Sequence, residues 1–149
     1  MTMLPQRIDR DVVEKAMGRA DKAGQYGAIY QDLLGFVPPR IEARLSVTGA
    51  LDPVMVEIQE RMREHGMYPK CFDVKTSQLM LFGMLLMDSS DAAVLHGIAA
   101  RRAGASWEEM QAVVNLCFLF RGLSAANRGA ETLANIAKRE ADTAARKAA

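Results

Sequence analysis

The sequence predicts an all-α protein, a compact multi-helix bundle. Alanine, methionine, leucine, glutamate and arginine are plentiful and aromatic residues make up only 6% of the chain, a composition that favours helices over sheets. Apolar residues recur at helical spacing, and glycines, prolines and capping residues separate the apolar stretches. A chain of 149 residues, half of them hydrophobic, can close one hydrophobic core, so we expect a single domain over residues 1–149.

Composition also limits the partners. The 19 basic and 18 acidic residues leave a net charge of +1, too little to attract nucleic acid or an anionic membrane. The most apolar run, residues 79–87, is too short to span a bilayer. Two widely separated cysteines and a start without an apolar signal are typical of a cytoplasmic protein. Metal-ligand spacings and a glycine-rich phosphate loop are absent from the sequence, so we expect neither a metal nor another cofactor.

The first 50 residues are predicted to form short, irregular helices. Helical patterns in the first half of the chain cover residues 8–20, 26–34, 40–47 and 53–64. Gly35 should end the second of these helices, and Pro38 and Pro39 should open the third. His65-Gly66 should end the fourth.

The second half has clearer helix boundaries, with helices predicted over residues 74–87, 90–103, 107–121 and 125–140. Asp73 should cap the first of these. Ser106 and Glu109 form the pattern of a capping box. Gly104 follows one helix end, and Ser124 should cap the last helix, whose alanine- and lysine-rich end is expected to fray.

His96 is the candidate catalytic residue. It falls on a helical stripe of alanines, and small neighbours leave room beside the imidazole. An imidazole changes charge near neutral pH and can give or take a proton, as general acid–base catalysis requires. The alternative is that the small residues let another helix approach closely, with His96 bonded to a backbone carbonyl.

Several motifs occur in an order that resembles the carboxymuconolactone decarboxylase and alkylhydroperoxidase D superfamily. They are DVKTSQL at residues 73–79, His96 on the following helix, AGASWEE at 103–109 and FRGLSAA at 120–126. Residues 73–140 form the best-matching core, with weaker support from residues 30–39. The resemblance implies a helical bundle that assembles into dimers, trimers or hexamers, with pockets between helices at subunit contacts.

The chain departs from the family pattern where the redox members carry their thiols. Peroxide-reducing members have C-x-x-C-x-x-x-H on the histidine helix, and the two cysteine places hold Ser89 and Ala92 here. Thiol chemistry of that type therefore cannot occur at this helix. The acidic residue that the family uses as a proton relay falls on Gln78 or Ser77, and neither side chain titrates.

The candidate substrate-binding residues are Gln78, Cys117, Phe120 and Arg121. Arg121 can hold a carboxylate by a bidentate contact, the alternative being a salt bridge at a subunit contact. Cys117 lies on an apolar stripe, where a cysteine is usually an inert hydrophobic residue. Phe120 stands in the place of the family tyrosine and Ser124 in that of its proline, which changes the expected pocket wall.

The sequence and the resemblance together predict a cofactor-independent lyase, similar to a decarboxylase, that acts on a small organic acid or lactone. His96 would be its general acid or base. One alternative is a non-catalytic small-molecule-binding protein, because Gln78 cannot relay a proton. Another is a hydroperoxide reductase, which would require Cys71 and Cys117 to meet. The apolar helix over residues 79–87 needs cover on most of its circumference, so we also expect a homo-oligomer.

Overall fold

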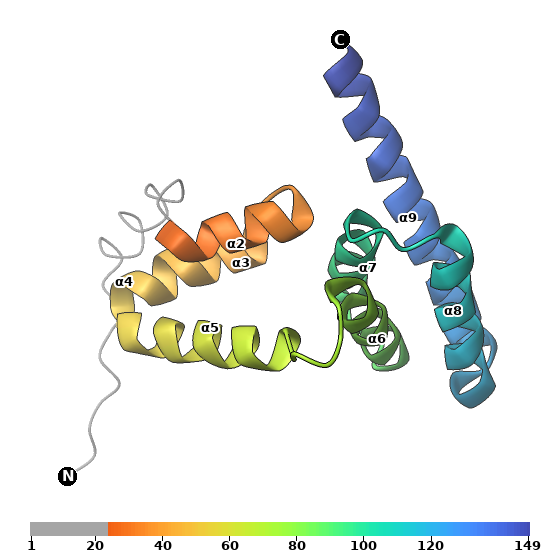
Figure 1. The fold of residues 1–149 in the computed structure, drawn as a ribbon, viewed down its shortest axis with the longest axis horizontal. Coiled ribbons are helices and arrows are strands. Elements are labelled where there is room, and N and C mark those ends of the chain that lie inside the picture. The colour runs from red at the N-terminus through yellow and green to blue at the C-terminus, as the bar shows by residue number, and fades with distance from the viewer. Residues whose placement is uncertain (1–23) are drawn as a thin grey trace. The chain divides into compact units, whose positions relative to one another are not determined.

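The computed structural model describes residues 24–149, and this part of the chain is helical and contains no strand (Figure 1). The all-α prediction is therefore confirmed. Contacts divide the chain into two compact units, residues 1–66 and 67–149, and each unit is described by itself. The single domain over residues 1–149 stays a prediction, and the helix predicted over residues 8–20 lies outside the described residues. None of the described helices is both long enough and apolar enough to cross a membrane.

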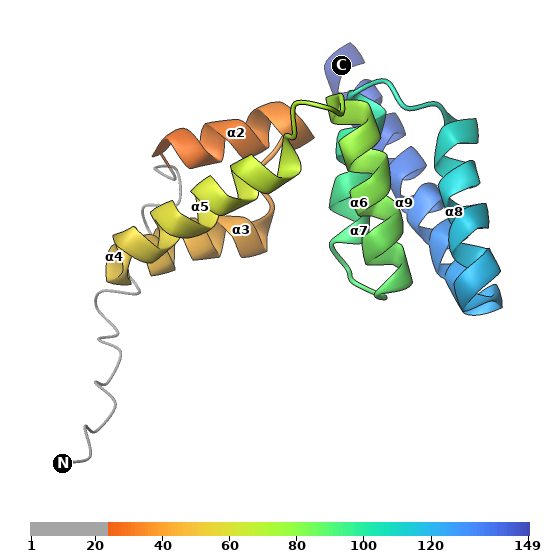
Figure 2. The same cartoon turned by 60° about the horizontal axis from the view of Figure 1, so that its bottom comes forward.

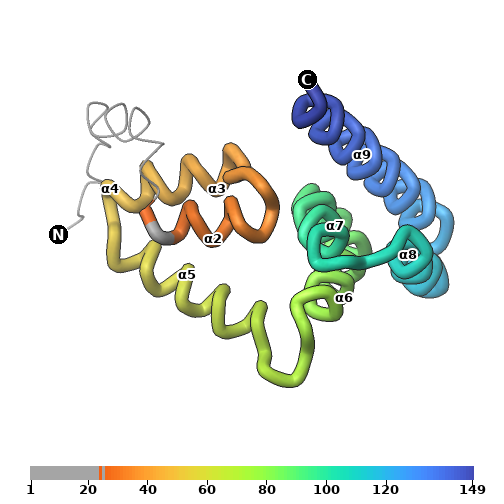
Figure 3. The backbone as a smooth tube through the Cα atoms, turned by 45° about the horizontal axis from the view of Figure 1, so that its top comes forward, coloured from red at the N-terminus to blue at the C-terminus, as the bar shows by residue number. Residues whose placement is uncertain are grey.

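Helical segments of alternating direction make up the described part of the first unit (Figure 3). They are α2 (Gly24–Leu34), a continuous stretch of α3 (Pro39–Ala43), the π-helical η2 (Arg44–Thr48) and α4 (Gly49–Leu51), and α5 (Pro53–Met67). Gly35 follows α2 with φ +81°, as expected for a glycine that ends a helix. The second segment is longer than the predicted helix over residues 40–47.

The predicted end of α5 is wrong. His65 and Gly66 lie inside the helix, which continues to Met67. Gly66 is not among the glycines with positive φ, so it does not adopt the left-handed conformation by which glycine terminates a helix. Pro69 follows two residues after Met67, and a proline cannot continue the helical hydrogen bonding.

The second unit is built from α6 (Val74–Met87), α7 (Ala93–Arg102), α8 (Trp107–Arg121) and α9 (Leu123–Ala148). Helix α6 packs against α7 and α8, and α9 packs against the same two helices (Figures 1 and 2). The predicted caps are confirmed at two positions. The Asp73 carboxylate accepts a hydrogen bond from the Thr76 backbone at 2.7 Å, and Ser106 and Glu109 form the reciprocal capping box.

Two helix starts differ from the prediction. Helix α7 begins at Ala93 rather than Ser90, because the preceding turn places Ser89 in the left-handed region with φ +58°. Helix α9 begins at Leu123, directly after Gly122 with φ +69°. Ser124 therefore lies within the first turn of α9 and does not cap it, and the helix extends past Glu140 to Ala148.

Glycines bring the helices of the second unit into close contact. Gly83 of α6 faces Val113 of α8, Gly97 of α7 faces Ile136 of α9, and Gly129 of α9 faces Val114 of α8. A Cβ atom at any of these glycines would lie less than 3.0 Å from a neighbouring side-chain atom. The residue directly after His96 thus serves helix packing, since Gly97 lets the side chain of Ile136 approach α7.

Candidate functional site

His96 lies on α7 and meets Gln78 of α6. Its Nδ1 atom is 2.8 Å from Oε1 of Gln78, a normal hydrogen-bond distance. The imidazole is half-buried, whereas Gln78 is 0% exposed. Gln78, one of the two residues predicted at the position of a relay acid, therefore contacts the candidate catalytic histidine.

The same segment of α6 carries buried polar atoms that have no hydrogen-bond partner within residues 24–149. These atoms are Nε2 of Gln78 and Oγ of Ser77. Leaving such a group buried and unpaired costs about 1–3 kcal/mol, and native proteins rarely accept that cost without a reason. An amide nitrogen donates hydrogen bonds only, so Nε2 of Gln78 is a buried donor without an acceptor among these residues.

The start of α6 is fixed by contacts on both sides of its first turn. Asp73 caps the helix, and the Lys75 ammonium lies 2.7 Å from the Glu109 carboxylate of α8. A hydrogen bond from Lys75 lowers the pKa of Glu109 and keeps it ionised. Because Gln78 follows within one turn, these contacts hold its backbone in place beneath His96.

Cys117 does not join this pair. Its thiol is buried and donates to the backbone oxygen of Gly83 at 3.5 Å. Burial raises the pKa of the Cys117 thiol, which disfavours the reactive thiolate. Cys71 is exposed, and both cysteines are free. These environments favour the interpretation of Cys117 as an inert hydrophobic residue.

Phe120 and Arg121 lie on the surface at the last turn of α8, where Phe120 is 81% exposed. Within residues 24–149, neither side chain forms a hydrogen bond or an ion pair with His96. The predicted roles of Phe120 as a pocket wall and of Arg121 as a carboxylate anchor stay predictions. Trp107 packs against Arg101, whose guanidinium carbon lies 4.0 Å from the centre of the indole ring.

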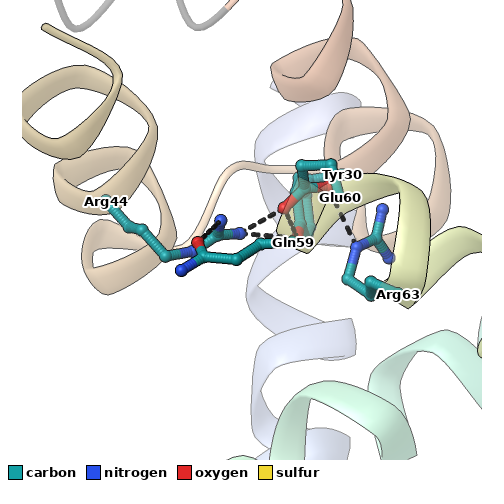
Figure 4. Close-up of polar contacts among 5 residues, drawn as sticks. All are labelled: Tyr30, Arg44, Gln59, Glu60 and Arg63. Atoms are coloured by element: carbon teal, nitrogen blue, oxygen red, sulfur yellow. Dashed lines mark hydrogen bonds and ion pairs between the residues drawn. The ribbon is translucent and has the colours of Figure 1, made fainter. Parts of the chain in front are cut away.

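A second polar cluster lies in the first unit (Figure 4). The Tyr30 hydroxyl donates to Glu60 at 2.9 Å, and the Arg63 Nε donates to the other carboxylate oxygen at 3.0 Å. Arg44 donates to Glu60, to the Tyr30 hydroxyl at 3.1 Å and to Gln59 at 3.0 Å. The Arg63 guanidinium also lies 4.4 Å from the centre of the Tyr30 ring.

Glu60 is ionised in this cluster although it is only 2% exposed. Burial alone would raise the pKa of Glu60, but hydrogen bonds from Arg44 and Tyr30, together with the charge of Arg63, lower it below the ordinary value. Burial is also the main reason that the pKa of Tyr30 rises to about 12. A carboxylate that accepts hydrogen bonds from three side chains is poorly suited to take a proton from a substrate. We therefore interpret the cluster as structural, because its hydrogen bonds join α2, η2 and α5.

Sequence reasoning missed this cluster because a glutamate on an amphipathic helix is normally exposed. One signal was available. Glu60 lies four residues after Val56, on the face of α5 that carries the buried residues, and four residues make about one helical turn.

Two hollows of the described surface are lined by residues other than His96. One lies along α5 beside Ile58, Met62 and His65. Another lies on α8 beside Trp107 and Gln111. Within the described residues, no three histidine, cysteine, aspartate or glutamate side chains gather as metal ligands.

Comparisons of the chain with protein-family models, with curated proteins and with solved structures found no match. The assignment of the candidate site therefore rests on the residues and distances described above.

Proposed function

We propose that the protein is a cofactor-independent lyase that resembles carboxymuconolactone decarboxylase and acts on a small organic acid or lactone. His96 moves the proton. The observation that carries the proposal is the contact between this half-buried imidazole and a fully buried amide whose Nε2 has no partner among residues 24–149. Such an arrangement combines an acid–base group with a donor for a substrate oxygen.

A non-catalytic small-molecule-binding protein is the second candidate. Gln78 cannot gain or lose a proton near neutral pH, so it cannot act as the second acid–base group of a proton relay. In that case the same donor would hold an oxygen atom of a ligand that is not transformed.

The first test is His96→Gln, assayed against a panel of small lactones and keto acids. If His96 transfers the proton, turnover of the reactive compound falls about a hundredfold. His65→Gln is the matched control, because His65 is the other histidine of the chain and is exposed on α5. Unchanged turnover in the His96 variant would remove this residue from the mechanism. Saturable binding of a panel compound, weakened by His96→Gln and without turnover, would favour the second candidate.

We also propose that the protein forms a homo-oligomer, a dimer, trimer or hexamer, through an apolar surface of the second unit. Exposed apolar side chains of this unit include Met80, Met84, Leu116, Leu119, Phe120 and Leu123. Helix α6, predicted to be buried on most sides, leaves Met84 59% exposed. A standard interface buries about 800 Å² on each partner, and large exposed apolar side chains are the kind that such a contact covers.

Leu119→Glu is expected to shift the protein to a lower mass, because a carboxylate cannot be buried at an apolar contact without a partner. Light scattering at micromolar concentration measures this mass. Gln111→Glu adds the same charge at another exposed position of α8 and should leave the mass unchanged. A monomeric mass for the unsubstituted chain would contradict the proposal.

A further inference from the structure

The contact between Gln78 and His96 bears on where the imidazole carries its proton. Nδ1 of His96 lies 2.8 Å from Oε1 of Gln78. An amide oxygen can only accept a hydrogen bond, so the hydrogen between these two atoms must belong to Nδ1. In a neutral imidazole the other nitrogen, Nε2, then carries the lone pair.

We infer that Gln78 is a positioning residue that holds neutral His96 as the Nδ1–H tautomer and makes Nε2 the basic atom of the site. This inference rests on the proposed function for its chemical meaning. It deepens that function because the resting enzyme would begin by taking a proton from its substrate, not by giving one.

The surroundings of Gln78 restrict the orientation of its side-chain amide. Its side chain is 0% exposed, and the cap at Asp73 and the ion pair from Lys75 to Glu109 hold the preceding turn. Histidine in water prefers the other tautomer, with the proton on Nε2. A neutral Nδ1–H ring at position 96 would therefore report the influence of Gln78 and not the intrinsic preference of the side chain.

The amide also differs from a carboxylate in charge. A carboxylate beside Nδ1 would stabilise the imidazolium, whereas the Gln78 amide orients the ring without adding a negative charge. The Gln78 amide therefore orients the ring without itself favouring the imidazolium.

This arrangement fits a substrate with an acidic C–H bond beside a carbonyl group, as in an unsaturated acid or lactone. Nε2 takes the proton, and the electron pair of the C–H bond moves towards the carbonyl oxygen to form a dienolate. The imidazolium then returns that proton to another carbon of the conjugated system. This proton shift needs no co-reactant, and in the proposed lyase it would supply the acid–base part of the reaction, separate from the cleavage of the carbon–carbon bond.

The tautomer is measured directly by long-range ¹H–¹⁵N correlation spectra of the full ¹⁵N-labelled chain, without substrate, at a pH where both histidines are neutral. The chain has two histidines, so His65→Asn assigns both rings. We expect His96 as the Nδ1–H tautomer and exposed His65 mainly as the Nε2–H tautomer. An Nε2–H ring at position 96 would mean that the amide faces the other way, and it would overturn the inference.

Two variants with side chains of about the same size as glutamine test whether Gln78 sets the tautomer of His96. Gln78→Met removes the acceptor, and His96 should move to the tautomer mixture of His65. Gln78→Glu keeps the acceptor and should retain the Nδ1–H form while raising the pKa of His96 by about one unit or more. A persistent Nδ1–H form in Gln78→Met would show that another group sets the tautomer.

The experiments distinguish a failure of the tautomer assignment from a folding defect and from a failure of the proposed function. If Gln78→Met does not fold, the unsubstituted chain and Gln78→Glu still decide the tautomer. An Nδ1–H ring together with unchanged turnover in His96→Gln would support the assigned tautomer and contradict the proposed function. Loss of turnover with an Nε2–H ring would do the opposite.

Discussion

Glu60→Ala is expected to destabilise the protein by about 4 kcal/mol, because it leaves the charges that surround a buried carboxylate without their partner. Glu60 is 2% exposed and accepts hydrogen bonds from Tyr30, Arg44 and Arg63. Its removal loosens three helical segments at once, since these donors lie on α2, η2 and α5.

Denaturant unfolding followed by circular dichroism measures this loss. Glu57→Ala is the control on the same helix, because Glu57 is exposed and its carboxylate lies 3.7 Å from Arg61. An exposed pair of this kind contributes roughly 0–1 kcal/mol. Equal effects of the two substitutions would contradict the assigned role of Glu60. The fluorescence of Trp107, the one tryptophan of the chain, shows separately whether the second unit is affected.

The Glu60 contribution should also depend on pH. The folded state lowers the pKa of Glu60 below the ordinary value of 4.5. A lowered pKa means that the unfolded chain binds the proton more readily, so the stabilisation is complete above that ordinary value. It is lost as the pH falls below 4.5 and through the folded-state pKa. The stability difference between the unsubstituted chain and Glu60→Gln should therefore shrink from pH 7 to pH 3.

Gly129→Ala is expected to cost about 3 kcal/mol, although alanine is the better helix former. A Cβ atom at position 129 would lie 2.5 Å from Cγ1 and 2.7 Å from Cγ2 of Val114. A β-branched side chain in a helix has little rotamer freedom, and Val114 is buried. Helices α8 and α9 would have to move apart to relieve the overlap. The loss of unfolding free energy should appear as a lower midpoint of the unfolding transition that is followed by Trp107 fluorescence.

Gly66→Ala provides the matched control, because a Cβ atom there has no neighbour within 4 Å. The substitution should stabilise α5 by about 0.5 kcal/mol through the lower conformational entropy of the unfolded chain. A stabilising effect of Gly129→Ala as well would show that α8 and α9 pack less closely than the structure describes.

Local signals were sufficient for the fold class and for several helix boundaries. The caps at Asp73 and Ser106 follow from hydrogen bonds between residues three positions apart, and such bonds can be recognised in a short stretch of sequence. Local signals failed where the same short stretch of sequence is compatible with two different helix boundaries. Gly66 continues a helix, and Gly122 replaces Ser124 at the start of α9.

The contacts of the candidate site could not be predicted without the tertiary structure. His96 could be selected from its residue type and its neighbours, but its contact with Gln78 joins residues 18 positions apart on two helices. The contact of Tyr30 with Glu60 spans 30 positions. Helical periodicity assigns a residue to a face of its own helix, whereas the relative placement of two helices depends on the packing of all their side chains. For that reason the sequence predicts the histidine and the all-α class, and only the folded chain decides which polar group contacts the imidazole.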